Sequence, residues 1–144
     1  MSINYWHSDE YWQLAEQVIA EHPDLSWIDK ALISIDYLEC DAEKKRASGP
    51  VLGECVLVKD LFRLYIPFDF LIVIYAPNVR RLSETQKKIL LYHELLHVDM
   101  GEKDGEPKYC VRPHDVEDFA AVIRRYGLDW AGDTAWQKAN TNTG

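Results

Sequence analysis

The sequence lacks several features that would place it in a special structural class. Its 144 residues contain only three cysteines and no Cys-x-x-Cys pair, so we expect reduced thiols rather than a disulfide framework. The longest apolar stretch, residues 65–77, is interrupted by Pro67 and Asp69 and is too short to cross a bilayer as a helix. The acidic N-terminus lacks the basic start of an export signal, so a cytoplasmic location is expected.

Positive charge is also scarce. The chain has 16 Lys and Arg against 24 Asp and Glu, which gives a formal net charge of -8. Binding to a phosphate backbone requires clustered Lys and Arg, so nucleic acid is not the expected partner. A length of 144 residues with 47% hydrophobic residues predicts one globular domain, residues 1–130, followed by a polar tail, residues 131–144.

The N-terminal third predicts one helix and one strand. Ser8 is a candidate N-cap, and apolar residues recur at helical spacing over residues 8–22, where Pro23 ends the pattern. Residues 31–41 alternate in the manner of a strand. The charged segment 43–50 contains Gly and Pro and is predicted to be a loop.

The middle of the chain is rich in β-branched and aromatic residues. The segments GECVLVKD and FRLYIPFDFLIVIYAPN predict two or three strands. An extended substrate would pair most simply with an exposed edge strand, for which residues 71–78 are a candidate. Strands as apolar as this one are, however, more often part of the core.

The helical pattern returns in the C-terminal third. Ser83 and Gln86 have the spacing of a capping box, and good helix formers continue to Gly101. Residues 102–113 contain Gly and Pro and are predicted to be a loop. A last helix is predicted over residues 114–127.

The predicted helix contains the sequence YHELLH, which places three ionisable residues in an apolar run. His93 and His97 are one helical turn apart, so one cation can bridge their rings. Together with Glu94 they form an HExxH motif, in which two neutral imidazoles bind zinc and the glutamate takes a proton from water. Metal binding would explain why such residues occur where burial normally excludes them.

A catalytic zinc usually has three protein ligands and one position for water. His114 is the preferred third ligand, since imidazole suits a catalytic zinc. Glu117 and Cys110 are the alternatives. Two more carboxylates of the same segment could orient an imidazole ring by accepting its N–H: Asp115 and Asp118.

These residues resemble the phage metallopeptidase family, and more distantly the SprT-like zinc proteases. The resemblance rests on SGPVLGECVLVKD, LYIPFDFLIVIYAPNV, QKKILLYHELLHV and RPHDVEDFAAVIRRYG. It implies an α+β, minimal zincin-like fold, in which a small, mainly antiparallel sheet packs on the HExxH helix beside N- and C-terminal helices. It also implies one zinc ion per chain, bound by His93, His97 and His114, with Glu94 as general base.

Two functions are therefore considered. The first is a zinc-dependent metallopeptidase that hydrolyses a protein or peptide of a bacterial host in the host cytoplasm. The second is a non-catalytic acidic phage protein that uses the metal for stability and inhibits a host factor. A structural site would need no base such as Glu94 and would usually have a fourth protein ligand. Three tyrosines could stabilise an oxyanion, although packing is the more common role for each: Tyr92, Tyr109 and Tyr126.

Overall fold

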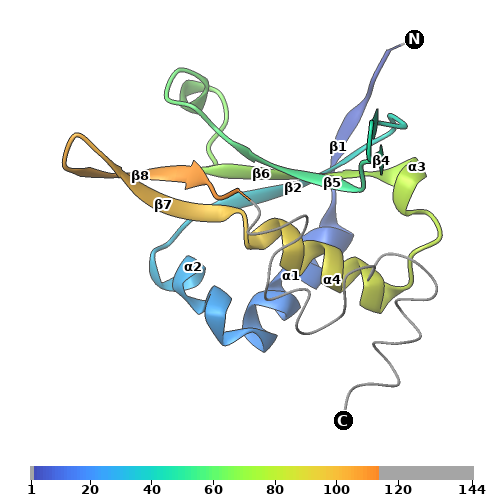
Figure 1. Cartoon of the computed structure of the whole chain (residues 1–144), viewed down its shortest axis with the longest axis horizontal. Coiled ribbons are helices and arrows are strands. Elements are labelled where there is room, and N and C mark those ends of the chain that lie inside the picture. Colours follow the sequence, from blue (N-terminus) through green and yellow to red (C-terminus); the bar gives the residue numbers. More distant parts are fainter. Residues whose placement is uncertain (1, 114–144) are drawn as a thin grey trace.

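A four-stranded sheet with helices on one face forms the body of the protein (Figure 1). The computed structural model of the chain describes residues 2–113. Its helices and strands confirm the predicted α+β class. In chain order they are β1 (Tyr5–His7), α1 (Asp9–Glu21), α2 (Ser26–Lys30), β2 (Ile35–Cys40), β3 (Lys45–Arg46), β4 (Gly49–Pro50), β5 (Gly53–Leu57), β6 (Phe70–Tyr75), α3 (Ala76–Val79), α4 (Glu84–Leu95), β7 (Val98–Lys103) and β8 (Glu106–Val111).

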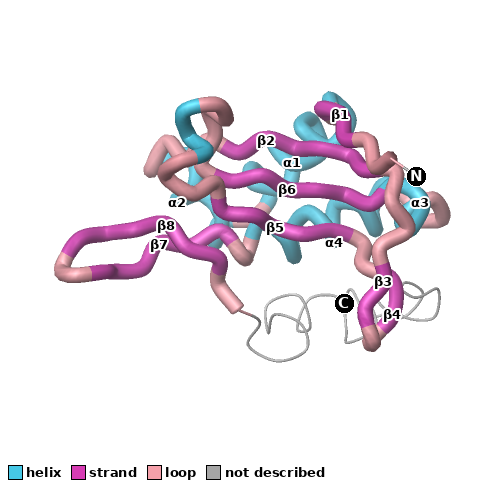
Figure 2. Tube along the Cα trace, turned by 90° about the horizontal axis from the view of Figure 1, so that it is seen from above, coloured by secondary structure: helices cyan, strands magenta, loops and turns pink. Residues whose placement is uncertain are grey.

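The strands of the main sheet lie in the order β1-β2-β6-β5 (Figure 2). β6 pairs in parallel with β2, while β5 pairs with β6 and β1 pairs with β2 in antiparallel fashion. Two of its three pairings are antiparallel, as predicted, and the parallel pairing of β2 with β6 makes the sheet mixed at its centre. Residues 71–78 begin in the central strand β6, so this candidate for an edge strand is not at an edge, and the core placement expected of so apolar a strand is confirmed. Within residues 2–113, the strand at the edge on this side is β5.

The first helix forms as its sequence predicts. Ser8 caps α1, because its Oγ accepts a hydrogen bond from the backbone N–H of Tyr11 at 3.2 Å. The helix ends at Glu21, and Pro23 opens a 3-10 turn. Its buried face packs against α4 and β2.

The core lies between the sheet and the helices. Alternate residues of β6 point to the same face of the sheet, and Phe70, Ile72 and Ile74 are all fully buried there. Full burial of one such side chain stabilises the fold by about 1.5–3 kcal/mol. From α4, the core receives Ile89 and Leu91, which fixes the helix beneath β5 and β6.

The C-terminal part of the described chain differs from the prediction. α4 ends at Leu95 rather than at Gly101, and the predicted loop over residues 102–113 is mostly strand. β7 and β8 form a hairpin that extends beyond the sheet (Figure 2). Its two turn residues, Asp104 and Gly105, have φ of 55° and 81°. An Asp-Gly pair with both φ positive makes the type I′ turn that favours a two-residue hairpin.

Other predictions fall on short or undescribed segments. The predicted loop over residues 43–50 contains the small hairpin β3–β4. The predicted last helix and the polar tail lie outside the described residues. None of the helices within residues 2–113 has the length and apolar character that crossing a bilayer requires.

Candidate metal centre

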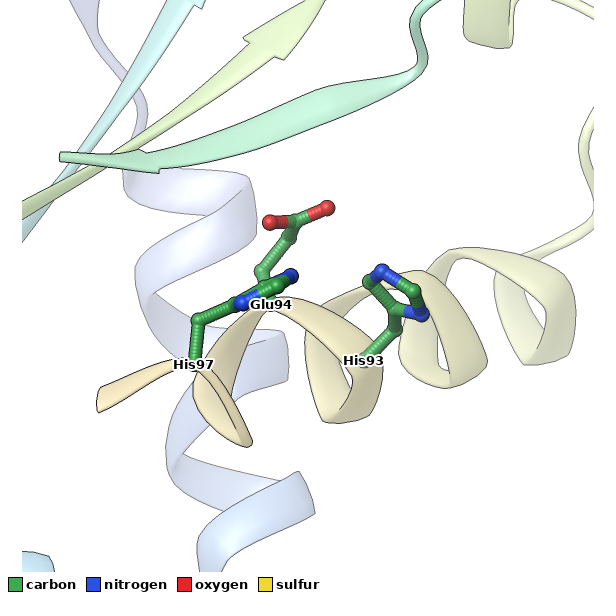
Figure 3. A group of neighbouring side chains, drawn as sticks. All are labelled: His93, Glu94 and His97. Carbon is green, nitrogen blue, oxygen red and sulfur yellow. The ribbon is translucent and has the colours of Figure 1, made fainter. Parts of the chain in front are cut away.

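Helix α4 holds the first two residues of the HExxH motif. Its N-terminus is fixed by the predicted capping box: the Ser83 side chain accepts from the Gln86 N–H, and the Gln86 side chain accepts from the Ser83 N–H. His93 and Glu94 lie in the last turn of the helix, on the part that faces β5 (Figure 3). Glu94 is only 3% exposed, so its carboxylate is held within the fold.

The second histidine lies just beyond the regular helix. The helix ends at Leu95, but the backbone N–H of His97 still donates to the carbonyl oxygen of Glu94 at 3.1 Å. This last turn keeps the His97 ring beside that of His93, with the ring centroids 5.2 Å apart. The potential ligand atoms of His93, Glu94 and His97 all lie within 4.8 Å of one another (Figure 3).

The His97 ring is oriented by the end of β8. Its Nδ1 lies 2.5 Å from the backbone carbonyl oxygen of Arg112. A carbonyl oxygen can only accept, so Nδ1 carries the proton and the lone pair of the ring is at Nε2. Metal-ligating histidines are commonly oriented by such a hydrogen bond from the second ring nitrogen. Two imidazoles arranged in this way fit a zinc ion.

Strand β5 forms the opposite wall of the site. A hollow of about 180 Å³ is lined by Gly53 and Cys55 of this strand together with the residues of the motif. A Cβ added at Gly53 would lie 3.5 Å from Cγ of Glu94, so the absence of a side chain lets the strand approach the helix closely. Burial, and secondarily the charge of Glu94, raises the pKa of the Cys55 thiol. Cys55 is therefore a neutral neighbour of the carboxylate.

A small network fixes the hairpin β3–β4 at the mouth of this hollow. Glu54 forms ion pairs with Lys44 and, at 3.3 Å, with Arg46. The same carboxylate accepts a hydrogen bond from the hydroxyl of Tyr75 at 3.1 Å. Arg46 also lines the hollow, so it brings positive charge to the rim of the site.

Only some of the predicted site residues lie in the described part of the chain. His93, Glu94 and His97 come together, whereas His114 lies outside the described residues. The same holds for Asp115, Glu117, Asp118 and Tyr126. Cys110 is on β8 and is not part of the cluster that the described residues form.

The two remaining tyrosines pack away from the motif. Tyr92 is a buried residue of α4, and its hydroxyl donates to Asp24 at 2.7 Å while its ring stacks on His22. Tyr109 packs edge-on against Phe70. These contacts support the packing role for both.

Sequence reasoning missed the contribution of β5 and of the β3–β4 hairpin to the site. A signal was present in Gly53, because a glycine at the start of an apolar strand often marks a close backbone approach. Arg46 carried no such signal, since it stands in a charged segment of ordinary composition. Its place beside the motif depends on tertiary structure.

Comparison with known protein families places the chain in one of them. A family model described as "Putative phage metallopeptidase" matches residues 3–140, nearly the whole chain. Neither the curated proteins nor the solved structures include one with significant similarity to this sequence.

Proposed function

The chain belongs to the phage metallopeptidase family, and from this premise we propose that it is a zinc-dependent peptidase with Glu94 as its general base. The family supports a metal-dependent hydrolase that acts on proteins or peptides. The observation that carries the finer proposal is the cluster of His93, Glu94 and His97 opposite an edge strand. We further propose that the substrate is a protein of the bacterial host, in whose cytoplasm the enzyme would act.

The proposed ligands are His93, His97 and His114. Support for the first two comes from their proximity and from the proton that Arg112 holds on Nδ1 of His97. Support for the third comes from the sequence, because His114 follows Arg112 by two residues, and two residues of chain span at most about 7 Å. When bound, zinc supplies a Lewis acid that acidifies water and polarises a carbonyl group.

The proposed role of Glu94 is to move a proton. Its carboxylate would accept the proton of the attacking water and then donate it to the amine that leaves. The position of Glu94 beside both imidazoles supports this role, since a general base must lie within hydrogen-bond reach of the proton that it takes. The edge strand β5 would align the substrate backbone by adding it to the sheet.

The decisive experiment compares wild type with Glu94→Gln. Both proteins are purified, their zinc content is measured, and each is incubated with bacterial lysate and with unfolded casein. We expect about one zinc per chain in both, but cleavage by wild type alone. A wild-type protein that binds no zinc would overturn the proposal, and equal cleavage by the variant would remove Glu94 from its role.

The same experiment separates the peptidase from the non-catalytic alternative. A protein that uses the metal only for stability would lose its thermal stability on treatment with a chelator, yet neither wild type nor variant would cleave any substrate. Cleavage that disappears with the chelator and returns with zinc, alongside an inactive Glu94→Gln, supports catalysis.

A further inference from the structure

A second and larger hollow lies next to the metal centre. It encloses about 640 Å³ between the segment that follows β5 and the hairpin β7–β8. In Figure 2 the hairpin extends away from the sheet beside the C-terminal end of β5. Met100, Pro107 and Tyr109 give the hollow an apolar lining on the hairpin side.

The charge of this hollow is opposite to that of the protein. Among the residues that the structure describes, four basic ones and a single acidic one, Asp60, line it, although the chain as a whole carries a formal charge of -8. Arg63 is neutralised by an ion pair with the buried Asp69. The other three bases, for which the described part of the chain offers no ion-pair partner, are exposed: Lys59, Lys103 and Lys108. The lining therefore keeps an excess of positive charge.

The two hollows share their walls. β5 contributes Gly53 and Cys55 to the metal centre and Leu57 to the basic hollow. β8, which lies in contact with β5, contributes Val111 to the first and Tyr109 to the second. A polypeptide that lies along the edge of β5 past Glu94 would therefore continue into the basic hollow.

We propose that the basic hollow is a specificity subsite that binds acidic side chains of the substrate. This inference rests on the proposed function, because it uses β5 as the strand that aligns the substrate. The lysine ammonium groups would pair with Asp or Glu side chains, while Tyr109 and Met100 would contact their aliphatic parts. The preferred substrate is then a peptide with an acidic segment near the cleaved bond.

Strand geometry gives the position of that segment. Cys55 lines the metal centre, and Lys59 of the basic hollow follows it by four residues. Four residues correspond to about 13 Å along an extended strand. In antiparallel pairing, substrate residues opposite the C-terminal end of β5 are N-terminal to those opposite Gly53. The acidic residues should therefore lie about three to five positions before the cleaved bond, at one residue per 3.3 Å.

Binding can be measured apart from catalysis. The full chain carrying Glu94→Gln is titrated against fluorescein-labelled peptides, and fluorescence anisotropy reports the affinity. One peptide carries glutamates in its N-terminal half, the second has glutamines there, and the third has the same glutamates in its C-terminal half. We expect the first to bind about tenfold more tightly than the second at low salt, as three partly exposed charge pairs allow, and more tightly than the third.

Charge-reversal variants test the residues themselves. In the Glu94→Gln background, the triple variant Lys59→Glu, Lys103→Glu, Lys108→Glu should lose this preference for glutamate. The matched control is the triple variant Lys30→Glu, Arg80→Glu, Arg81→Glu, which changes the net charge equally at exposed positions outside the hollow. The control should keep the preference, and circular dichroism should show that both variants fold.

Three results would overturn the inference. They are equal affinity for the glutamate and glutamine peptides, equal loss of affinity in the two triple variants, and displacement of the acidic peptide by a DNA oligonucleotide at lower concentration than by unlabelled peptide. Failure of the proposed function would look different, since acidic peptides would still bind at the lysines while wild type cleaved nothing. Cleavage of peptides without any preference for glutamate would refute the subsite alone.

Discussion

His97 and Arg112 exchange two hydrogen bonds across the start of the β7–β8 hairpin. The backbone N–H of Arg112 donates to the carbonyl oxygen of His97 at 2.7 Å, and Nδ1 of His97 donates to the carbonyl oxygen of Arg112 at 2.5 Å. The hairpin therefore returns the chain to the metal centre. The hydrogen bond to the Arg112 carbonyl also keeps the proton of His97 on Nδ1. The end of the hairpin therefore determines which ring nitrogen of this proposed ligand can face a metal.

Loss of either imidazole should remove the metal. We expect His93→Ala and His97→Ala each to lower zinc affinity about 100-fold or more, since even the loss of a group that only orients a ligand costs about 10–100-fold. Competition with a chromophoric chelator measures this affinity. His7→Ala is the matched control, because His7 pairs with Asp36 on β1 and β2 and is not part of the cluster. Wild-type affinity in either motif variant would contradict the assignment.

A side chain at Gly53 should disturb the site. The Cβ of Gly53→Ala would lie 3.1 Å from Cδ1 of Ile74 and 3.2 Å from the carbonyl oxygen of Val73. The carbonyl can shift only with the sheet, so we expect a loss of about 1 kcal/mol in unfolding free energy and a lower kcat. The control is Gly101→Ala, whose Cβ would meet only one atom of the described residues, Sγ of Cys110 at 3.4 Å. Urea denaturation and peptide cleavage should show Gly53→Ala impaired and the control close to wild type.

Two buried tyrosines should respond to loss of their hydroxyl groups in opposite ways. Tyr92→Phe removes the hydrogen bond to Asp24 and leaves a carboxylate with one donor fewer, so it should cost about 1–2 kcal/mol. The hydroxyl of Tyr11 is buried and has no hydrogen-bond partner within the described residues, so Tyr11→Phe should be neutral or slightly stabilising. Thermal denaturation of the two variants measures the contrast. Equal destabilisation would contradict the assigned hydrogen bond.

Local signals in the sequence predicted much of this fold. The N-cap Ser8 and the capping box of Ser83 and Gln86 act through backbone groups a few residues away, so they are readable without tertiary information. The HExxH spacing is local as well, since it depends only on the helical repeat. It brought His93 and His97 together although the regular helix ends between them.

The β7–β8 hairpin was not predicted, although the sequence contains a signal for it. The good helix formers before Leu96 led the helix to be extended to Gly101 through Val98 and Asp99, which are weaker ones, and the Asp104–Gly105 pair, a strong hairpin signal, was not used. The residues that surround the metal centre could not be predicted from local sequence patterns. Arg46 lines the hollow and pairs with Glu54 of β5, a contact that no local pattern reveals.

Alkaline pH should destabilise the protein in part through Tyr37. This side chain is only 4% exposed, and burial is the main cause that raises its pKa above the ordinary value of 10.0. In the unfolded chain the phenol loses its proton near pH 10, whereas in the folded chain it keeps the proton at higher pH. Above about pH 10 the unfolded state therefore binds fewer protons, and the unfolding free energy falls as the pH rises.

One tyrosine accounts for at most about 1.4 kcal/mol per pH unit of this slope. Tyr37→Phe should therefore show a shallower fall in unfolding free energy above about pH 10 than wild type, as measured by urea denaturation at a series of pH values. Tyr65→Phe is the control, because it removes a phenol that is 83% exposed, and its slope should match wild type. If the unfolding free energy of the two variants fell equally steeply with pH, Tyr37 would ionise equally easily in the folded and unfolded chains. That result would contradict the proposed effect of its burial.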